Sequence, residues 1–278
     1  MQGRRRRLNV ISPKINTKDL GILNAFDDEY NGVIIDSEGL PSSPNSFSSI
    51  LRSSLSHWKQ RGKNGVWLKI MARQAHLVHI AIKEGFVYHH AETGYVVLTF
   101  WLPDEQPCML PSTGSHQIGI GAFVINENKE VLVVKEKKCP LRCSGVWKMP
   151  TGFIDKSEEI YLGAIREVKE ETGIETEFLQ VVAFRHAHFV SFEKSDLFFI
   201  CMLKPLSSQI TIDGKEIEDA KWMQLEDFLD QPFYKEDFMS KSAIEICIAK
   251  HEQRYKGFSA HEMMSKFDDR NSHLYYAE

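Results

Sequence analysis

Three glutamates within five residues, Glu167, Glu170 and Glu171, constrain the structure of this chain more than any other feature. A helix turns by about 100° per residue, so these side chains would lie within about 100° of one another, on one face. Like charges at this spacing repel unless a cation lies between them, and Mg²⁺ and Mn²⁺ prefer oxygen ligands. The run therefore predicts a metal-binding helix face, with a solvated acidic face as the alternative.

The residues around the glutamates extend this prediction. On the same helical wheel, Leu162, Ile165 and Val168 lie opposite the glutamates, so we expect them to be buried while the acidic face points into a cleft or solvent. Gly152 and Gly173 bracket the segment. The first suits a loop whose backbone must come close to another group, and the second suits a left-handed helix end.

The whole segment has a defined spacing: Gly152, five residues, Glu158, seven residues, Arg166-Glu167-Val168, Lys169, Glu170-Glu171, Thr172, Gly173 and Ile174. It satisfies every fixed position of the Nudix hydrolase signature, and the chain therefore resembles this family. A solvated acidic helix face would leave the flanking residues unexplained. The resemblance implies an α/β protein, an α/β/α sandwich with a mixed sheet, that hydrolyses a nucleoside diphosphate linked to another group.

The resemblance also implies roles for individual residues. Glu167, Glu170 and Glu171, with the backbone carbonyl of Gly152, would hold Mg²⁺ or Mn²⁺. Arg166 would orient a ligand carboxylate, unless it forms only an ordinary surface ion pair.

Two further acidic positions complete the predicted site. Glu158 would lie where the helix begins, where the helix dipole favours a carboxylate, and support the loop or a further metal ion. Glu216 is the predicted general base or fourth acidic ligand, and Glu218 is the second choice, although a solvent-facing role suits either residue equally well.

Outside this segment, the Pro- and Ser-containing residues 103–116 interrupt two periodic regions and predict a linker. We therefore expect a flexible arm over residues 1–25, a small α/β domain over residues 26–110 and the hydrolase domain over residues 111–278. In the small domain, Leu51, Leu55 and Trp58 have helical spacing and are predicted core residues.

Periodicity predicts the elements of both parts. In the first part it indicates strands over residues 30–35, 65–70, 86–90 and 95–101, and helices over residues 44–60 and 73–84. In the second part it indicates a hairpin of residues 118–125 and 130–135, strands over residues 178–186, 197–203 and 220–223, and helices over residues 225–229 and 238–255.

Residues 88–92 and 113–116, YHHAE and TGSH, resemble plant Nudix hydrolases with an N-terminal α/β extension, including a branch with a plastid-assigned member. The chain is also similar to an animal homologue encoded antisense to a fibroblast growth factor gene. We expect the first domain to support a homodimer or part of the substrate pocket. Neighbouring residues of a strand point to opposite faces, so His89 and His90 are predicted to have packing or surface roles rather than to share a metal ion.

Composition excludes several functional classes. A net charge of -4 argues against nucleic-acid partners, and no run of about 18–20 apolar residues predicts a membrane span. The five cysteines are scattered, which favours a reducing compartment and a cytoplasmic protein, with the chloroplast as the alternative. The run Arg4–Arg7 is interpreted as part of a flexible tail, with a weak nuclear address or the trimmed end of an organelle transit peptide as the alternatives. Cys139 and Cys143 are interpreted as part of a loop, with a redox-sensitive pair as the lesser alternative.

The substrate is the least determined property. ADP-ribose and NADH lead by analogy with plant relatives, although the array linked to NADH is absent and the proline of many ADP-ribose enzymes is replaced near His186 and His188. Trp147, Phe153 and Phe184 are aromatic residues that could stack on adenine. The alternatives are hydrolysis of oxidised nucleoside triphosphates and a nucleotide-sensing module without catalysis.

Overall fold

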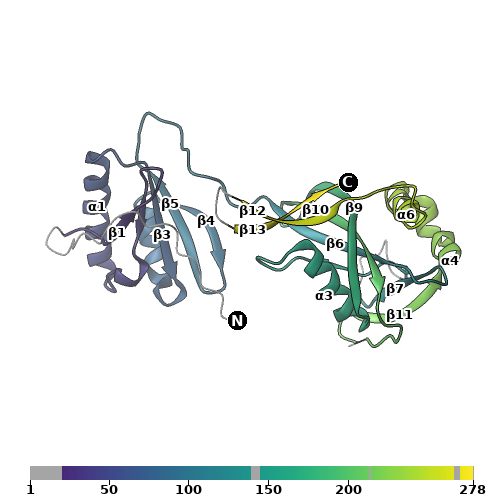
Figure 1. The fold of residues 1–278 in the computed structure, drawn as a ribbon. Coiled ribbons are helices and arrows are strands. Elements are labelled where there is room, and N and C mark those ends of the chain that lie inside the picture. Colours follow the sequence, from purple (N-terminus) through teal and green to yellow (C-terminus); the bar gives the residue numbers. More distant parts are fainter. Residues whose placement is uncertain (1–20, 139–144, 213, 266–269, 278) are drawn as a thin grey trace. The chain divides into compact units, whose positions relative to one another are not determined.

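The computed structural model describes residues 21–138, 145–212, 214–265 and 270–277. Within it the chain forms two compact units, one ending at Thr113 and the other beginning at Gly114 (Figure 1). The predicted arginine tail and the Cys139–Cys143 loop lie outside the described residues. No helix in the described parts of the chain is both long and apolar enough to cross a membrane.

The first unit is a five-stranded sheet with helices packed on it (Figure 1). Its strand order is β1-β2-β3-β5-β4. The elements are β1 (Ala25–Asp27), β2 (Val33–Ile35), α1 (Pro44–Gln60), β3 (Gly65–Met71), a 3₁₀ helix (Ala72–Leu77), α2 (Val78–Lys83), β4 (Val87–Glu92) and β5 (Tyr95–Trp101).

Helix α1 has the predicted bounds because its sequence has a proline in the first turn and apolar residues at helical spacing. Pro44 occupies the first turn, where its missing N–H costs nothing. Phe47, Leu51 and Trp58 recur at helical spacing and are buried against the sheet, and Leu55 is partly buried beside them. The predicted core of this unit is therefore confirmed.

Three predictions for the first unit need correction. The predicted arm extends to residue 25, but Leu23 is only 3% exposed and β1 begins at Ala25, so the folded part starts earlier. The helix expected over residues 73–84 is a 3₁₀ helix followed by the short α2. The strand expected over residues 30–35 is limited to β2, because Asp28 accepts hydrogen bonds from Tyr30 and Gly32 and closes a turn there.

The prediction that His89 and His90 point to opposite faces is wrong. The pairing of β4 with β5 shifts register between Tyr88 and His90, which marks a β-bulge. The bulge re-aims one side chain, so that the two Nδ1 atoms lie 2.7 Å apart. Both rings therefore belong to one aromatic group with Trp67 and Tyr95.

The second unit is an α/β/α sandwich with a mixed sheet. Its elements are β6 (His116–Val124), β7 (Glu130–Glu136), β8 (Thr151–Phe153), α3 (Ile160–Thr172), β9 (Thr176–Ser191), β10 (Lys194–Pro205), β11 (Ile217–Gln224), α4 (Leu225–Asp230), α5 (Pro232–Glu236), α6 (Phe238–His251), β12 (Ser259–Ser265) and β13 (Arg270–Tyr276). Four strands have the order β8-β6-β10-β9, with β6 and β10 parallel, and β7 pairs with β11.

Two cores lie on the two faces of this sheet. Helix α3 buries Ala164 and Val168 against Ile120, whereas α6 buries Ile244 and Cys247 on the opposite face (Figure 1). Residues of β6 alternate between the faces, as expected for a strand covered on both sides. Packing against the sheet therefore fixes the position of α3 relative to the edge strand β8.

The hairpin predicted for residues 118–135 forms its turn but not its ladder. Lys129 donates to the carbonyl of Asn126, and an isolated bridge joins Ile125 to Val131. Beyond it the strands part, because β6 pairs with β8 and β10 while β7 pairs with β11. The strand pair β12–β13 follows the last predicted helix and was not expected from the sequence.

Candidate active site

Helix α3 is the predicted signature helix, and its two ends are set by local contacts. Before its first turn, the backbone N–H of Asp155 donates to the Glu158 carboxylate at 2.9 Å, which closes the loop that leaves β8. At the other end, Gly173 has φ 73° and its N–H donates to the carbonyl of Lys169. The predicted left-handed helix end is confirmed, since such a backbone favours glycine.

The buried face of α3 differs from the prediction. Val168 is fully buried and Ile165 partly buried, but Leu162 is 45% exposed. Glu171 is only 7% exposed and belongs to the buried face. The three glutamates therefore do not share one environment: Glu170 faces solvent, Glu167 is partly buried and Glu171 lies inside.

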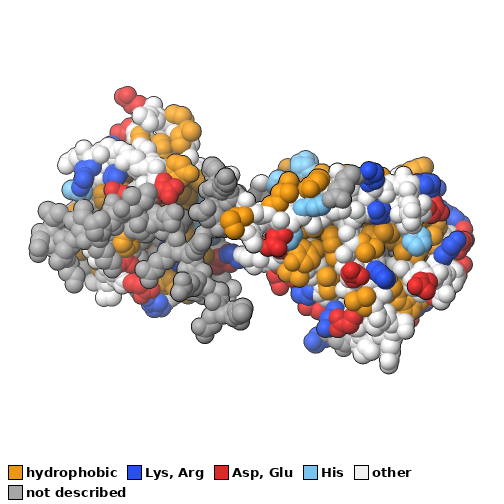
Figure 2. All heavy atoms as spheres, in the orientation of Figure 1, with side chains coloured by type: hydrophobic (Ala, Val, Ile, Leu, Met, Phe, Trp, Pro, Cys, Tyr) orange, Lys and Arg blue, Asp and Glu red, His pale blue; other side chains and the backbone are white. Residues whose placement is uncertain are grey.

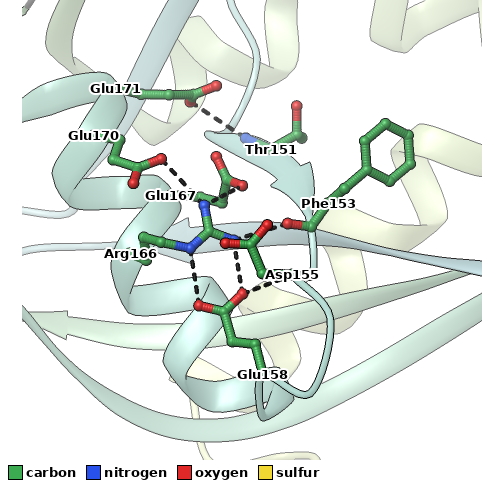
Figure 3. Close-up of polar contacts among 8 residues, drawn as sticks. All are labelled: Thr151, Phe153, Asp155, Glu158, Arg166, Glu167, Glu170 and Glu171. Atoms are coloured by element: carbon green, nitrogen blue, oxygen red, sulfur yellow. Dashed lines mark hydrogen bonds and ion pairs between the residues drawn. The ribbon is translucent and has the colours of Figure 1, made fainter. Parts of the chain in front are cut away.

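Arg166 is the centre of the acidic cluster (Figure 3). Its guanidinium bonds both oxygens of Glu158 at 2.8 Å, Glu167 at 2.7 Å, Glu170 at 3.1 Å and the carbonyl of Phe153 at 2.8 Å. The bidentate pair with Glu158 holds the pKa of that carboxyl below its usual range and raises the pKa of Arg166. Burial raises the pKa of Glu167, against the influence of Arg166.

The position of Glu167 depends on a glycine. A Cβ atom at Gly152 would lie 1.9 Å from Cδ of Glu167, closer than any real contact. The prediction that backbone must come close to another group at Gly152 is thus confirmed, and that group is a carboxylate.

The structure does not direct the Gly152 carbonyl toward the glutamates. Ala122 donates to the Pro150 carbonyl and Ile154 to that of Ile118, so by strand alternation Gly152 bonds toward β6. The outward peptide groups belong to Thr151, whose N–H donates to Glu171 at 3.3 Å, and to Phe153, whose carbonyl accepts from Arg166. The backbone oxygens on the carboxylate side of β8 are therefore those of Thr151 and Phe153, and the Phe153 oxygen accepts from Arg166.

The carboxylate of Glu171 is buried inside the protein. Burial raises the pKa of this carboxyl to about 8, and the nearby charge of Glu167 adds to the shift. The charge of Lys148 and the Thr151 N–H oppose it. Lys148 donates to Thr151 Oγ1 at 3.1 Å and forms an ion pair with Glu136.

Lys148, Thr151 and Glu136 were not singled out from the sequence. Lys148 lies four residues and Thr151 one residue before Gly152, and this closeness in sequence was the only local signal. Their relation to Glu171 arises from the pairing of β7 with residue 148, where Val134 and Lys148 form a bridge.

The donor set suits a hard cation, although the side chains do not converge as they stand. Among the described residues, no three His, Cys, Asp or Glu side chains are arranged as a ready-made metal site. Arg166 holds Glu167 and Glu170, while Glu171 turns to Thr151 (Figure 3). All these donors are oxygens, and Glu170 is 59% exposed, so it can rotate toward Glu171 without leaving a core.

In the described parts of the chain, the side chains of the other predicted site residues form none of the hydrogen bonds of this cluster. Glu216 is exposed, and its backbone carbonyl accepts from Lys137, while Glu218 pairs with Lys135. Trp147 packs against the core on the α6 face of the sheet, and the Lys221 ammonium lies over its ring. Phe153 and Phe184 are 59% and 57% exposed. The Phe153 ring points away from the carboxylates (Figure 3). A cavity of about 500 Å³ on α3, lined by Tyr161, Phe178 and His273 among others, includes none of the predicted site residues.

Comparison with known proteins identifies both parts of the chain. Residues 115–242 match the family described as NUDIX domain, and residues 23–102 match one described as Nudix hydrolase domain. Nudix hydrolase 8 of Arabidopsis thaliana is 60% identical over 259 residues, covering 93% of this chain and 70% of the relative.

Two further relatives agree with these matches. Nudix hydrolase 2 of Arabidopsis thaliana is 47% identical over 92% of this chain and 90% of its own length. Human nucleoside diphosphate-linked moiety X motif 6 is 38% identical over 65% of this chain and 57% of its own length. The matches span both compact units.

Proposed function

Because this chain belongs to the Nudix hydrolase family, whose members act on nucleotide derivatives, we propose that it cleaves the diphosphate of ADP-ribose or NADH with the help of Mg²⁺ or Mn²⁺. The observation that supports this proposal is the arrangement around Arg166, which gathers Glu158, Glu167 and Glu170 beside the buried Glu171. A purely structural helix would have no reason to keep a carboxylate inside the protein.

Glu167, Glu170 and Glu171 would hold the cations, and the Thr151 carbonyl is a backbone oxygen on their side of β8 that could join them. Bound cations supply neutralisation of the diphosphate charge and Lewis acidity toward phosphorus. In the metal-free protein, ionisation of Glu171 at neutral pH costs free energy, because burial raises its pKa to about 8. Metal binding and deprotonation of Glu171 should therefore be coupled.

The remaining residues hold these ligands in place. Arg166 fixes Glu167 in one rotamer, and Glu158 fixes Arg166 through two parallel hydrogen bonds. Gly152 leaves room for Glu167. Glu216 stays the predicted general base, and wild-type kcat in a Glu216→Gln variant would remove it from the reaction.

Adenine-containing substrates are proposed by analogy, and two exposed aromatic rings suit them. Phe153 pairs with Gly119 across β8 and β6, so its ring stands beside a strand position without a side chain. Phe184 lies against Phe199, with ring centroids 5.6 Å apart and ring planes tilted by 34°. Either ring offers a flat face to a base.

A panel of substrates tests the proposal. The protein is incubated with Mg²⁺ or Mn²⁺ and ADP-ribose, NADH, other nucleoside diphosphate derivatives and oxidised guanosine triphosphate, and the products are separated chromatographically. Release of AMP from ADP-ribose or NADH supports the proposal, whereas exclusive hydrolysis of the oxidised triphosphate would identify a sanitising hydrolase. Binding without hydrolysis of any nucleotide would identify a sensor.

Three further properties stay predictions. One is the division into a small domain over residues 26–110 and a hydrolase domain over residues 111–278, which the stability of fragments would test. Another is the homodimer, which a measurement of mass would test. Hydrophobic side chains reach the surface of the second unit over a wide area (Figure 2), which suits an assembly with a second copy. Cys201 and Cys247 are free and buried, in keeping with the expected cytoplasmic compartment, with the chloroplast as the alternative.

A further inference from the structure

We propose that Lys148, rather than Arg166, is the positively charged side chain that contacts the diphosphate of the substrate. This inference rests on the proposed function and assigns a further residue to it. Lys148 lies outside the signature segment, four residues before Gly152, and sequence reasoning gave it no role.

Arg166 has no donor left for a phosphate. A guanidinium carries five N–H groups. The structure gives Arg166 five hydrogen bonds, of which four go to carboxylate oxygens of Glu158, Glu167 and Glu170 and one to the carbonyl of Phe153. Its charge is also matched by several carboxylates. Arg166 therefore positions ligands and cannot bind the substrate without releasing one of them.

Lys148 is held in place but keeps a donor. Its backbone is anchored on β7, since Lys148 N donates to Val134 O and Val134 N to Lys148 O at 3.0 and 2.8 Å. Within the described parts of the chain, its ammonium donates to Glu136 and to Thr151 Oγ1. An ammonium has three donors, so one remains for a ligand. The side chain is 24% exposed, which leaves that donor accessible.

Hydrogen bonds through Thr151 link Lys148 to Glu171, a proposed metal ligand. Thr151, which accepts from the Lys148 ammonium, donates its own N–H to Glu171 at 3.3 Å. A diphosphate that shares cations with Glu171 would thus come within reach of Lys148.

Other lysines near β7 are engaged elsewhere. Lys135 forms an ion pair with Glu218 at 2.9 Å, and Lys137 donates to the carbonyl of Gly214. Glu136 and Thr151 both accept from the Lys148 ammonium and so restrict its rotamers. A restrained cation loses less entropy on binding an anion than a free surface lysine would.

A structural role for Lys148 makes a different prediction. If it only balances the charges of Glu136 and Glu171, its removal should weaken metal binding and stability, and substrate affinity should fall only in proportion. If it binds the diphosphate, substrate affinity should fall while metal affinity stays the same or rises, since a positive charge beside the cation site is removed.

The test compares Lys148→Met, Lys148→Gln and Lys148→Arg with the full-length wild type, and Lys169→Met serves as the control. Lys169 is an exposed lysine of α3 that pairs with Glu175. Four quantities are measured: kcat and KM for ADP-ribose, the Kd of its non-hydrolysable methylene diphosphonate analogue by calorimetry, and the Kd of Mn²⁺ without nucleotide. Lys148→Gln keeps a donor for Glu136 if the methionine variant does not fold.

We expect the neutral variants to raise KM and the Kd of the analogue by about 10- to 100-fold, the scale of a hydrogen bond to a charged group. Their Mn²⁺ affinity should not fall, Lys148→Arg should recover most of the binding, and the control should match the wild type. Unchanged analogue affinity, or a loss in step with weaker Mn²⁺ binding, would overturn the role of Lys148. Absence of wild-type hydrolysis of any diphosphate would instead overturn the proposed function.

Discussion

Gly152 and Glu167 occupy space that no larger pair of residues could share. A Cβ atom at position 152 would lie 1.9 Å from Glu167 Cδ and 2.2 and 2.3 Å from its two oxygens. The backbone of β8 and a carboxylate of α3 thus meet directly, and the absence of one side chain sets where the other can stand.

A Gly152→Ala variant should therefore lose activity while keeping its fold. The methyl group would push Glu167 out of its contact with Arg166, and we expect kcat to fall at least about 10²-fold, on the scale of losing an electrostatic stabiliser. Gly114→Ala is the matched control, because a Cβ there meets nothing within 4 Å. Wild-type kcat in a folded Gly152→Ala enzyme would show that the position of Glu167 is unimportant.

Glu170→Gln and Glu171→Gln should each lower kcat by at least about 10²-fold, because either change removes a negative ligand from the cation site. Circular dichroism checks that the fold survives. Glu177→Gln, a change on the exposed start of β9, serves as the control. Turnover at the wild-type rate by both folded variants would exclude the signature glutamates from the reaction.

In the metal-free protein, Glu171→Gln should raise stability, and the gain should depend on pH. Burial raises the pKa of Glu171 to about 8 from its ordinary 4.5, so the folded state holds this proton more tightly than the unfolded chain. The favourable contribution is complete below about pH 4.5 and is lost as pH rises through about 8.

The variant has no such proton to lose, so its advantage should grow to the order of a few kcal/mol by pH 9. Thermal melts of both proteins in EDTA at pH 5, 7 and 9 measure this. A difference in Tm that does not change between pH 5 and pH 9 would refute a buried, titrating Glu171.

Activity should vanish in EDTA and return with Mg²⁺ or Mn²⁺, since clustered glutamates repel an anionic diphosphate unless cations lie between them. Ca²⁺, which is larger and less demanding in geometry, should bind but support little turnover. Metal should also raise Tm, because it binds the native state. Hydrolysis of ADP-ribose that continues undiminished in chelator would contradict the metal-dependent mechanism.

The fragment from Gly114 to Glu278 should fold alone, because both cores of the second unit lie within it. We expect weaker substrate binding or weaker dimerisation than in the full chain, since the first unit is predicted to support one of them. Light scattering and steady-state kinetics of the two proteins measure this. Identical mass and kinetics would show the first unit to be dispensable for both.

The amino-acid sequence by itself determined the local elements and the identity of the acidic cluster. Helix α1 has its predicted bounds because Pro44 and the spacing of Phe47, Leu51 and Trp58 are local signals. Gly173 has the positive φ of the predicted left-handed helix end, and Gly152 lies where a Cβ atom would meet Glu167, as the predicted close backbone approach requires. These properties depend on residues a few positions apart.

Tertiary structure alone decided which side of each element faces the core and which strands pair. A helical wheel gives the angle between side chains but not the direction of the core, so Leu162 is exposed and Glu171 buried. The expected hairpin partners β6 and β7 pair mainly with β10 and β11, because register is chosen by contacts distant in sequence. The same distant pairing brings Lys148 beside Glu171, a relation that no local pattern contains, since β7 must first hold residue 148 in place.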